Sequence, residues 1–296
     1  MEKSRTHKRR FGDRKDGRRL RTLAPYYRIT SFMMPTRNDS TNYYDDRFEI
    51  SAAEALIRKL KSEDGYTGIS ILHIFIAAYI RVVSEFPAIN RFIAGQRVFA
   101  RNKITVAMVV KKALSPDASE TNFRIDFVPT DTLFDVHKRV EEEIQKIKSG
   151  ESGNKAEDTA KTLIKLPRLL LKFVVWLLKL MDYFGVLPQS IIDASLFHSS
   201  LVISDLGSVG IGKIFHHLYN FGNLPILLAF GKKYGIYELD KEGKPAERRY
   251  IDYGVATDER ICDGYYYALS FRHLNHYLHK PEILLTPPKE VKEDID

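Results

Sequence analysis

Residues 250–278 read YIDYGVATDERICDGYYYALSFRHLNHYL, and this stretch decides the fold. Residues 250–257 predict a strand, because tyrosine, isoleucine and valine recur in a short run. The polar segment 258–264 (DERICDG) predicts a compact turn, and the aromatic-rich segment 265–278 predicts a helix. A strand, a short turn and a helix in this order expose the turn side chains at the edge of a layer.

Three further strands are predicted upstream of this stretch. They are residues 200–204 (SLVIS), residues 224–230 (LPILLAF) and residues 234–239, which lead into the turn DKEGKP. After the first of them, Gly207, Gly210 and Gly212 indicate a backbone that passes close to another segment. Their spacing differs from the GxGxxG of a dinucleotide-binding loop, and we therefore reject that class of site.

The first half of the chain predicts further strands and helices. Residues 69–86 (ISILHIFIAAYIRVVSEF) are apolar nearly all round, which indicates a buried helix that ends before Pro87. His73 lies inside it, and we interpret it as a core residue without a catalytic role. The other predicted elements are strands at 42–51, 104–111 and 123–128, a helix at 52–61, a surface helix at 132–148 capped by Thr130 and Asp131, and a polar linker at 150–158.

The composition is that of a globular protein. The 296 residues are 44% hydrophobic and 28% charged, which is enough to bury a sizeable core. Cys262 is the only cysteine, which excludes an internal disulfide and zinc clusters built on several thiolates. The first residues are charged rather than apolar, unlike a signal peptide. We expect a cytoplasmic protein, with a membrane-peripheral position as the alternative.

The net charge of +8 is concentrated at one end. Residues 1–21 hold ten Lys or Arg against three acidic residues, so the rest of the chain is nearly neutral. We interpret residues 1–25 as a basic, disordered arm, because no apolar periodicity supports folding. The alternative is a clamp for acidic lipid headgroups, nucleic acid or the phosphates of CoA. We do not expect nucleic acid, because stacking aromatics are not interleaved with the basic residues.

Residues 163–187 (LIKLPRLLLKFVVWLLKLMDYFGVL) are dense in apolar side chains. Arg168, Lys172 and Lys179 fall at spacings of four and seven, which places one basic stripe along an apolar helix. We favour a helix packed in the core or under a neighbouring subunit. The alternative is a helix on an anionic membrane surface, with Phe173 and Trp176 opposite the stripe.

Three segments in chain order resemble the catalytic domain of 2-oxoacid dehydrogenase acyltransferases. VISDLGSVGI resembles the family's ISNLG strand and turn, PILLAFGK its AILAVGK strand, and TDERICDGYYYA its YDHRVVDGAxxA signature. Upstream, EFPAINRF resembles the family's FPxxNA, and the similarity spans about residues 42–285. The resemblance implies an α/β, chloramphenicol acetyltransferase-like fold, an α+β two-layer sandwich of a mixed β-sheet packed with helices. We expect this domain at 26–285, with an added apolar helical segment at 159–195 and a polar tail at 286–296.

The resemblance also implies roles for single residues. The family's base is the histidine of HxxxDG, which takes a proton from a thiol, and Glu259 stands at that position. Ser204 matches the hydroxyl that stabilises the oxyanion. Asp263 and Gly264 match the final DG, whose aspartate holds the turn through an arginine, here Arg28 or Arg37. Gly207 matches the glycine of the strand-end turn.

Glutamate in place of histidine changes the chemistry. A solvated carboxyl has a pKa of about 4.3, against about 8.5 for a thiol, so it is a weak base unless burial raises its pKa. The competing interpretation is that Glu259 forms an ion pair with Arg260 or another cation and does no chemistry. Ser204 has a competing interpretation as a turn former.

Other residues could supply the missing imidazole or thiolate. His216 and His217 lie between the two family strands and are candidate bases, or histidines at a subunit contact. His273, His276 and His279 repeat every third residue, which does not suit a metal pair on one helix, so we expect no metal. Cys262 is a candidate acyl acceptor, although a lone cysteine is usually a small buried hydrophobe.

Three hypotheses follow. The first is an acyltransferase that moves an acyl group between CoA and a thiol, amine or hydroxyl acceptor; the second is a catalytically inactive relative that serves as an oligomeric binding module. The third is a protein bound to an anionic membrane through the basic arm and residues 163–187. The family's site lies between subunits, so the resemblance implies a homotrimer in which Glu259 and Ser204 approach each other only between protomers. A lipoyl-like domain and an Ala/Pro-rich linker are absent from the sequence, and we therefore expect no intrinsic place in a dehydrogenase core.

Overall fold

The computed structural model describes residues 9–63, 65–111, 120–149, 161 and 163–296. A six-stranded sheet has the order β2-β9-β8-β7-β5-β6, and a three-stranded sheet has the order β1-β4-β3. The strands are β1 Gly17–Arg19, β2 Thr41–Glu49, β3 Arg91–Ala94, β4 Arg97–Arg101, β5 Ile104–Lys111, β6 Glu120–Phe127, β7 Leu201–Asp205, β8 Ile226–Leu239 and β9 Pro245–Asp258. The helices are α1 Pro25–Met33, α2 Ser51–Glu63, α3 Ile71–Glu85, α4 Leu133–Lys148, α6 Arg168–Tyr183, α7 Gln189–Ala194 and α8 Gly264–His279.

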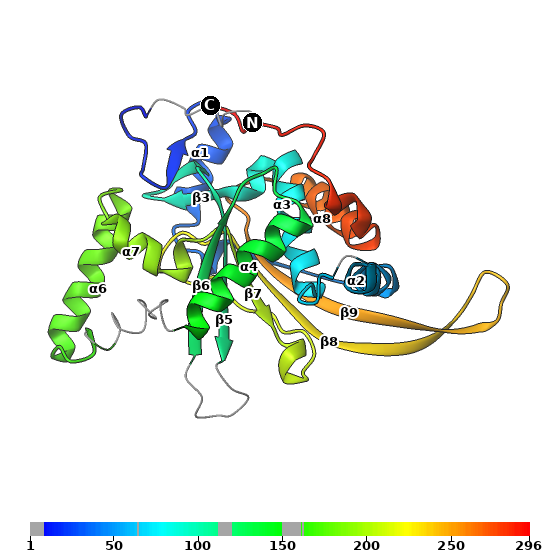
Figure 1. Ribbon diagram of the computed structural model, residues 1–296. Helices are drawn as coiled ribbons and strands as arrows, with labels where there is room; N and C mark the ends of the chain where they lie inside the picture. The colour runs from blue at the N-terminus through cyan, green and yellow to red at the C-terminus, as the bar shows by residue number, and fades with distance from the viewer. Residues whose placement is uncertain (1–8, 64, 112–119, 150–160, 162) are drawn as a thin grey trace.

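The large sheet is mixed. Strands β5, β7 and β8 run parallel at its centre, and β6, β9 and β2 pair antiparallel outside them. Helices α3, α4 and α8 cover one face, where the main hydrophobic core lies between helix and strand side chains (Figure 1). This arrangement confirms the predicted α/β class with a mixed sheet packed against helices.

Helix α3 is the centre of that core. All of its residues except Leu72 and Glu85 are buried, as expected for a segment that is apolar on every side. Ser70 caps its first turn together with His73, and the helix ends at Glu85, two residues before Pro87. The predicted buried helix and the core position of His73 are confirmed.

The opposite face of the sheet is covered by the connection between β7 and β8. Val202, Leu227 and Ala256 from three neighbouring strands pack there against Leu218 and Leu224. This second face therefore carries irregular backbone instead of a helical layer.

Part of the predicted basic arm is folded. Strand β1 pairs with β4, and the Arg14 side chain lies 5% exposed between Asp16 and Asp182. Arg14 Nε is 2.8 Å from an Asp16 carboxyl oxygen, and its Nη2 is 2.6 Å from Asp182. The composition predicted a solvated arm, since it gives no sign of a partner as distant in the sequence as Asp182. In the structure, arginines of residues 9–25 instead pair with carboxylates of the folded domain.

The residues at the other end of the chain are also bound to the domain. Asp294 accepts from Arg91 at 2.7 Å, and the backbone oxygen of Asp296 accepts from the N–H groups of Arg21 and Thr22. Residues 286–296 are therefore polar, but contacts at Asp294 and Asp296 bind them to the domain.

Two predicted boundaries differ from the structure. The strands expected at 224–230 and 234–239 are one strand, β8, which keeps its pairing with β9 across a bulge between Phe230 and Lys233. Helix α4 is capped by Thr132, whose side chain exchanges hydrogen bonds with Asp135, and not by Thr130 and Asp131. The other predicted strands and helices occur within a few residues of the expected positions, and the linker expected at 150–158 lies outside the described residues.

Helix α6 lies at the surface, and its residues are half-buried or exposed. None of its residues is buried, and Figure 1 shows it at the edge of the molecule, away from the large sheet. Packing in the core of this chain, which we favoured, is therefore wrong. The Tyr183 hydroxyl donates to the side chain of Gln96 at 2.9 Å, which fixes the C-terminal end of α6 beside the small sheet. No helix in the described part of the chain has the length and apolar character needed to span a bilayer.

Asp182 should make the stability of the fold depend on pH. Burial alone would raise the pKa of Asp182, but the neighbouring His198 ring and the Arg14 guanidinium more than offset this and lower the pKa to about 2. A lowered pKa stabilises the fold above about pH 4, and this contribution is lost as the pH falls from about 4 towards 2. Asp182→Asn should therefore cost about 2 kcal/mol at pH 7 and progressively less below pH 4.

Urea unfolding of both proteins between pH 7 and pH 2 measures this difference. Asp45→Asn is the control, because the Asp45 side chain is 54% exposed in its pair with Lys213. A cost of Asp182→Asn that does not change with pH would contradict the assignment.

Candidate active site

The turn after β9 is built on a buried ion pair. Arg260 Nε and Nη2 donate to the two carboxylate oxygens of Asp258 at 2.7 and 2.6 Å, and both side chains are at most 2% exposed. Ser40 adds a hydroxyl donor to Asp258 at 3.1 Å, and Arg260 also donates to the backbone oxygen of Met34 at 2.8 Å. Two-point contact of this kind compensates for burying both charges, and it sets the path of the backbone through residue 259.

Glu259 lies between the two members of this pair and is half-buried. Its backbone N–H donates to Ser40 O at 2.9 Å, and Asn42 Nδ2 donates to Glu259 Oε2 at 2.7 Å. The alternative that Glu259 pairs with Arg260 is wrong, because that guanidinium binds Asp258. The carboxylate is thus oriented by a neutral amide.

Asp263 ends the turn and begins α8. One of its oxygens accepts from the backbone N–H of Tyr266 at 2.7 Å, and the other accepts from the Tyr27 hydroxyl at 3.0 Å. The Tyr266 amide in particular lowers the pKa of Asp263. Gly264 is the first residue of the helix.

The arginine expected to hold Asp263 does not do so in this structure. Of the two candidates, Arg37 donates instead to the backbone oxygens of Ile93 and Tyr219, at 3.2 and 3.3 Å. Arg91, which the sequence did not single out, donates to Ile261 O at 3.1 Å inside the turn. The turn therefore has an arginine contact, but it goes to a backbone oxygen, and a tyrosine holds the aspartate.

Ser204 lies on β7, on the face opposite the helices. Side chains alternate along a strand, so Ser204 points to the same side as Val202, which packs under the β7–β8 connection. In the sheet, Ser204 is level with Ala229 and Gly254. Glu259 follows Gly254 by five residues, which separates it from Ser204 by roughly 16 Å along the strands and roughly 10 Å across them. One chain alone does not bring the two side chains together.

The glycine turn after β7 packs tightly on β8. A Cβ at Gly207 would lie 2.8 Å from Gly231 O, and a Cβ at Gly231 would lie 2.5 Å from Lys213 N. Gly210 has a φ of 79°, a conformation that favours glycine. The expected close approach is confirmed at Gly207, where the neighbouring segment is β8, but a Cβ at Gly210 or Gly212 would meet no atom within 4 Å.

His216 and His217 lie in the connection over the Ser204 face. The connection contacts the sheet at Gly254, where an added Cβ would be 3.1 Å from Ile214 O and from the Phe215 ring. His216 Nε2 is buried without a hydrogen-bond partner among the described residues. Burial, and then the nearby His217, lower the pKa of His216, which keeps it neutral at neutral pH. His217 packs against the ring of Tyr219, 4.8 Å between centroids.

The remaining candidates have other contacts. His273 lies 3.0 Å from Glu85, and His279 contacts the backbone oxygen of Asn275. The Cys262 thiol is buried, and burial raises its pKa, so it is a protonated thiol and a weak nucleophile at neutral pH.

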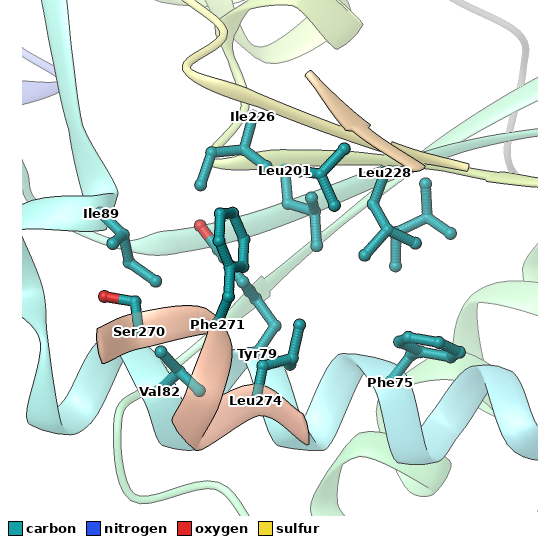
Figure 2. A pocket seen from close by; sticks show the side chains of 12 residues that line it. Phe75, Tyr79, Val82, Ile89, Leu201, Ile226, Leu228, Ser270, Phe271 and Leu274 are labelled. Carbon is teal, nitrogen blue, oxygen red and sulfur yellow. The ribbon is translucent and has the colours of Figure 1, made fainter. Parts of the chain in front are cut away.

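The cavity in Figure 2 lies inside the core, apart from these residues. Figure 2 shows Phe75, Tyr79 and Phe271 from α3 and α8 facing Leu201 and Leu228 from the sheet. Its volume of about 20 Å³ is lined by side chains that are almost all apolar. A space of this size holds about one water molecule, so it is a packing defect and not a channel for an acyl chain.

Several residues of the site were missed by sequence reasoning. Asn42 is adjacent to Glu259 only through the pairing of β2 with β9, which opposes Asn42 to Thr257. Tyr27 reaches Asp263 from more than two hundred residues away. The Asp258–Arg260 pair did have a local signal, since the two residues flank Glu259 in the DERICDG turn.

Removal of Arg260 should be costly. Arg260→Met leaves Asp258 buried without its cation and should lower the free energy of unfolding by about 3–5 kcal/mol. The double change Asp258→Leu with Arg260→Met removes both charges and should cost less than Arg260→Met alone. Urea unfolding measures both, with Arg47→Met as the exposed control, since that side chain is 51% exposed. Equal costs for the single and double variants would contradict a coupled pair.

No protein-family model matches the sequence, and no curated protein matches it. Solved structures do match. Dihydrolipoamide acetyltransferase of Azotobacter vinelandii gives a TM-score of 0.57 at 16% identity, over 90% of this chain and 94% of that one. The probable dihydrolipoamide acetyltransferase of Listeria monocytogenes gives 0.55 at 13% identity, over 89% and 95%. A chloramphenicol acetyltransferase gives 0.50 at 14% identity, over 85% and 93%. The chain therefore has the fold of 2-oxoacid dehydrogenase acyltransferase catalytic domains and chloramphenicol acetyltransferase, as its three motifs predicted.

Proposed function

We propose that this chain is a CoA-dependent acyltransferase in which Glu259 takes the place of the usual histidine base. The observation that carries the proposal is the Glu259 carboxylate itself. It is held at the end of β9 by the buried Asp258–Arg260 pair and by Asn42, on a fold shared with acetyltransferases. The acceptor is a thiol, an amine or a hydroxyl.

The proposed chemistry follows from the different surroundings of the two carboxylate oxygens of Glu259. Because Asn42 donates to Oε2, Oε1 is the oxygen that takes the proton of the acceptor as it attacks the thioester carbon of acyl-CoA. The Ser204 hydroxyl donates to the oxyanion of the tetrahedral intermediate. The intermediate collapses by breaking its C–S bond, and the CoA thiolate that leaves takes the proton back from Glu259.

This mechanism needs Ser204 and Glu259 of different chains. They are separated within one chain and lie toward opposite edges of the sheet, because β9 runs antiparallel to β8 and therefore to β7. The Azotobacter enzyme was studied for the roles of a serine, a histidine and an asparagine in its catalytic mechanism, and another structure with this fold is the cubic core of the pyruvate dehydrogenase complex. We therefore propose a homotrimer whose sites lie between neighbouring protomers.

Two alternatives differ from this mechanism in testable ways. His216 is the second candidate base, because it is neutral and its Nε2 lacks a partner among the described residues. The other alternative is a catalytically inactive relative that binds CoA or an acyl chain as an oligomeric module. The weak basicity of an ordinary carboxyl toward a thiol favours this second alternative.

Acyl transfer should depend on Glu259 and Ser204. With acetyl-CoA and a panel of small thiol, amine and hydroxyl acceptors, Glu259→Gln should lower kcat/KM by about 10²–10⁴-fold. Ser204→Ala should lower it by about 10²–10³-fold. His276→Gln, an exposed change on α8, is the control. Loss of activity with His216→Gln but not with Glu259→Gln assigns the base to histidine, and CoA binding without turnover in the native protein supports the inactive module.

Mixing the two variants tests the shared site. Chains with Glu259→Gln and chains with Ser204→Ala, unfolded and refolded together, should form mixed trimers in which some sites have both native residues. Activity should then recover to a fraction of the native value, while each variant refolded alone stays inactive. No recovery in mixed trimers would place both residues of a site on one chain.

We also propose that α6 docks on an anionic membrane surface. The four positions Leu169, Phe173, Trp176 and Leu180 share one exposed face of the helix, with Trp176 54% exposed. Arg168, Lys172 and Lys179 border this face as a single stripe, where their charges would reach lipid headgroups. Much of the charge of the described N-terminal segment is already paired, as Arg14 is with Asp16 and Asp182, so the proposal depends on α6.

Trp176 is the only tryptophan of the chain and reports on this contact directly. Its fluorescence should shift to shorter wavelength with phosphatidylserine vesicles, and rising salt should reverse the shift. Lys172→Glu with Lys179→Glu should abolish it, while Lys241→Glu on the exposed β8–β9 turn should not. A fluorescence shift that appears with protein concentration and without vesicles would instead indicate that a second copy covers α6.

A further inference from the structure

Although the spacing of the α8 histidines led us to expect no metal, we propose that His73, His137 and Glu141 form a binding site for one Zn²⁺ ion between α3 and α4. One ligand atom from each residue lies within 4.8 Å of the others, the one such group of three found among the described residues. The proposal is independent of acyl transfer, since none of these residues belongs to the Glu259 turn or to β7.

The unsatisfied nitrogens point to a ligand. His73 is 4% exposed, and its Nε2 is buried without a hydrogen-bond partner in the part of the chain that the structure describes. The same part of the chain offers no partner to the buried Nδ1 of His137. A buried polar atom without a partner is costly, and two of them on neighbouring rings, with ring centroids 5.3 Å apart, are explained by a shared metal ion.

The donor set suits zinc. Two imidazole nitrogens and one carboxylate oxygen are a known zinc ligand set, with a water molecule in the fourth position. His137 and Glu141 are four residues apart on α4, which places both on one face of the helix.

Ser70 would orient the ring of His73. The Ser70 hydroxyl lies 2.9 Å from His73 Nδ1, and the backbone N–H of Ser70 donates to the same nitrogen at 3.1 Å. When zinc binds, the ring proton moves from Nε2 to Nδ1 and is donated to the Ser70 hydroxyl, the backbone N–H of Ser70 gives up its hydrogen bond to Nδ1, and the Nε2 lone pair is left for the metal. The number of protons on the ring does not change.

The space around the site is small. A Cβ at Gly68 would lie 2.8 Å from the His137 ring and 3.0 Å from a Glu141 oxygen. Zinc bonds of about 2.1 Å require ligand atoms roughly 3.5 Å apart, so the side chains close by about 1 Å when the ion binds. The half-buried Glu141 and His137 side chains have the freedom for this movement.

Metal titration tests the site. The full chain is treated with EDTA, dialysed and titrated with Zn²⁺ by calorimetry, and with Co²⁺ while visible absorption is recorded. We expect one Zn²⁺ per chain, displacement of Co²⁺ by Zn²⁺, and a higher melting temperature with metal. His137→Ala should abolish binding and Glu141→Gln should weaken it at least tenfold. The control is His276→Ala, an exposed histidine on α8.

Three outcomes would overturn the proposal: no stoichiometric binding, binding that His137→Ala leaves unchanged, or binding that His276→Ala removes. Circular dichroism confirms that each variant is folded, and His137→Ala is used before any change at His73 because His73 also caps α3. Gly68→Ala is the second variant. It should weaken zinc binding by crowding the ring of His137 while leaving all three ligands in place.

Discussion

The buried pair of Asp258 and Arg260 is the contact on which the candidate site depends. It joins the end of β9 to the start of β2 through Ser40 and to the end of α1 through Met34. A charge buried in this position is tolerated only while its partner is present, so the turn has one stable conformation. Glu259 lies near the start of that turn, and Asp263 caps α8 at its end. The position of the carboxylate is thus a consequence of its two neighbours in the sequence.

Much of the fold could be predicted, because its elements are periodic and local. Helix α3 is apolar on all sides, β5 and β7 are short apolar runs, and the polar turn before α8 is compact. The basic segment around Arg14 was wrongly predicted to be disordered, because its contacts are not local in the sequence. Arg14 pairs with Asp16 and with Asp182, which is 168 residues away, and composition alone contains no sign of the second contact. The bulge in β8 was also hidden, since a GKK sequence reads as a break between strands.

The sequence motifs identified candidate residues of the site, but they did not predict which residues contact them. Ser204, Glu259 and Asp263 were identified by their place in two of the three short segments. The partner of Glu259, Asn42, follows from the register of β2 against β9, and the distance to Ser204 follows from the register of β7, β8 and β9. Register is set by packing across the whole sheet and is not a local property of any of these strands.

The attachment of α6 has a mechanical consequence. Its C-terminal end is held by the contact of Asp182 with Arg14, and Asp182 also lies 3.6 Å from His198, three residues before β7 begins. A force on the helix is therefore transmitted through two contacts. One leads through Arg14 to the small sheet, and the other leads through His198 to the start of β7, the strand that carries Ser204. A surface that binds α6 therefore acts mechanically on the strand that carries Ser204, and not on the opposite edge of the sheet.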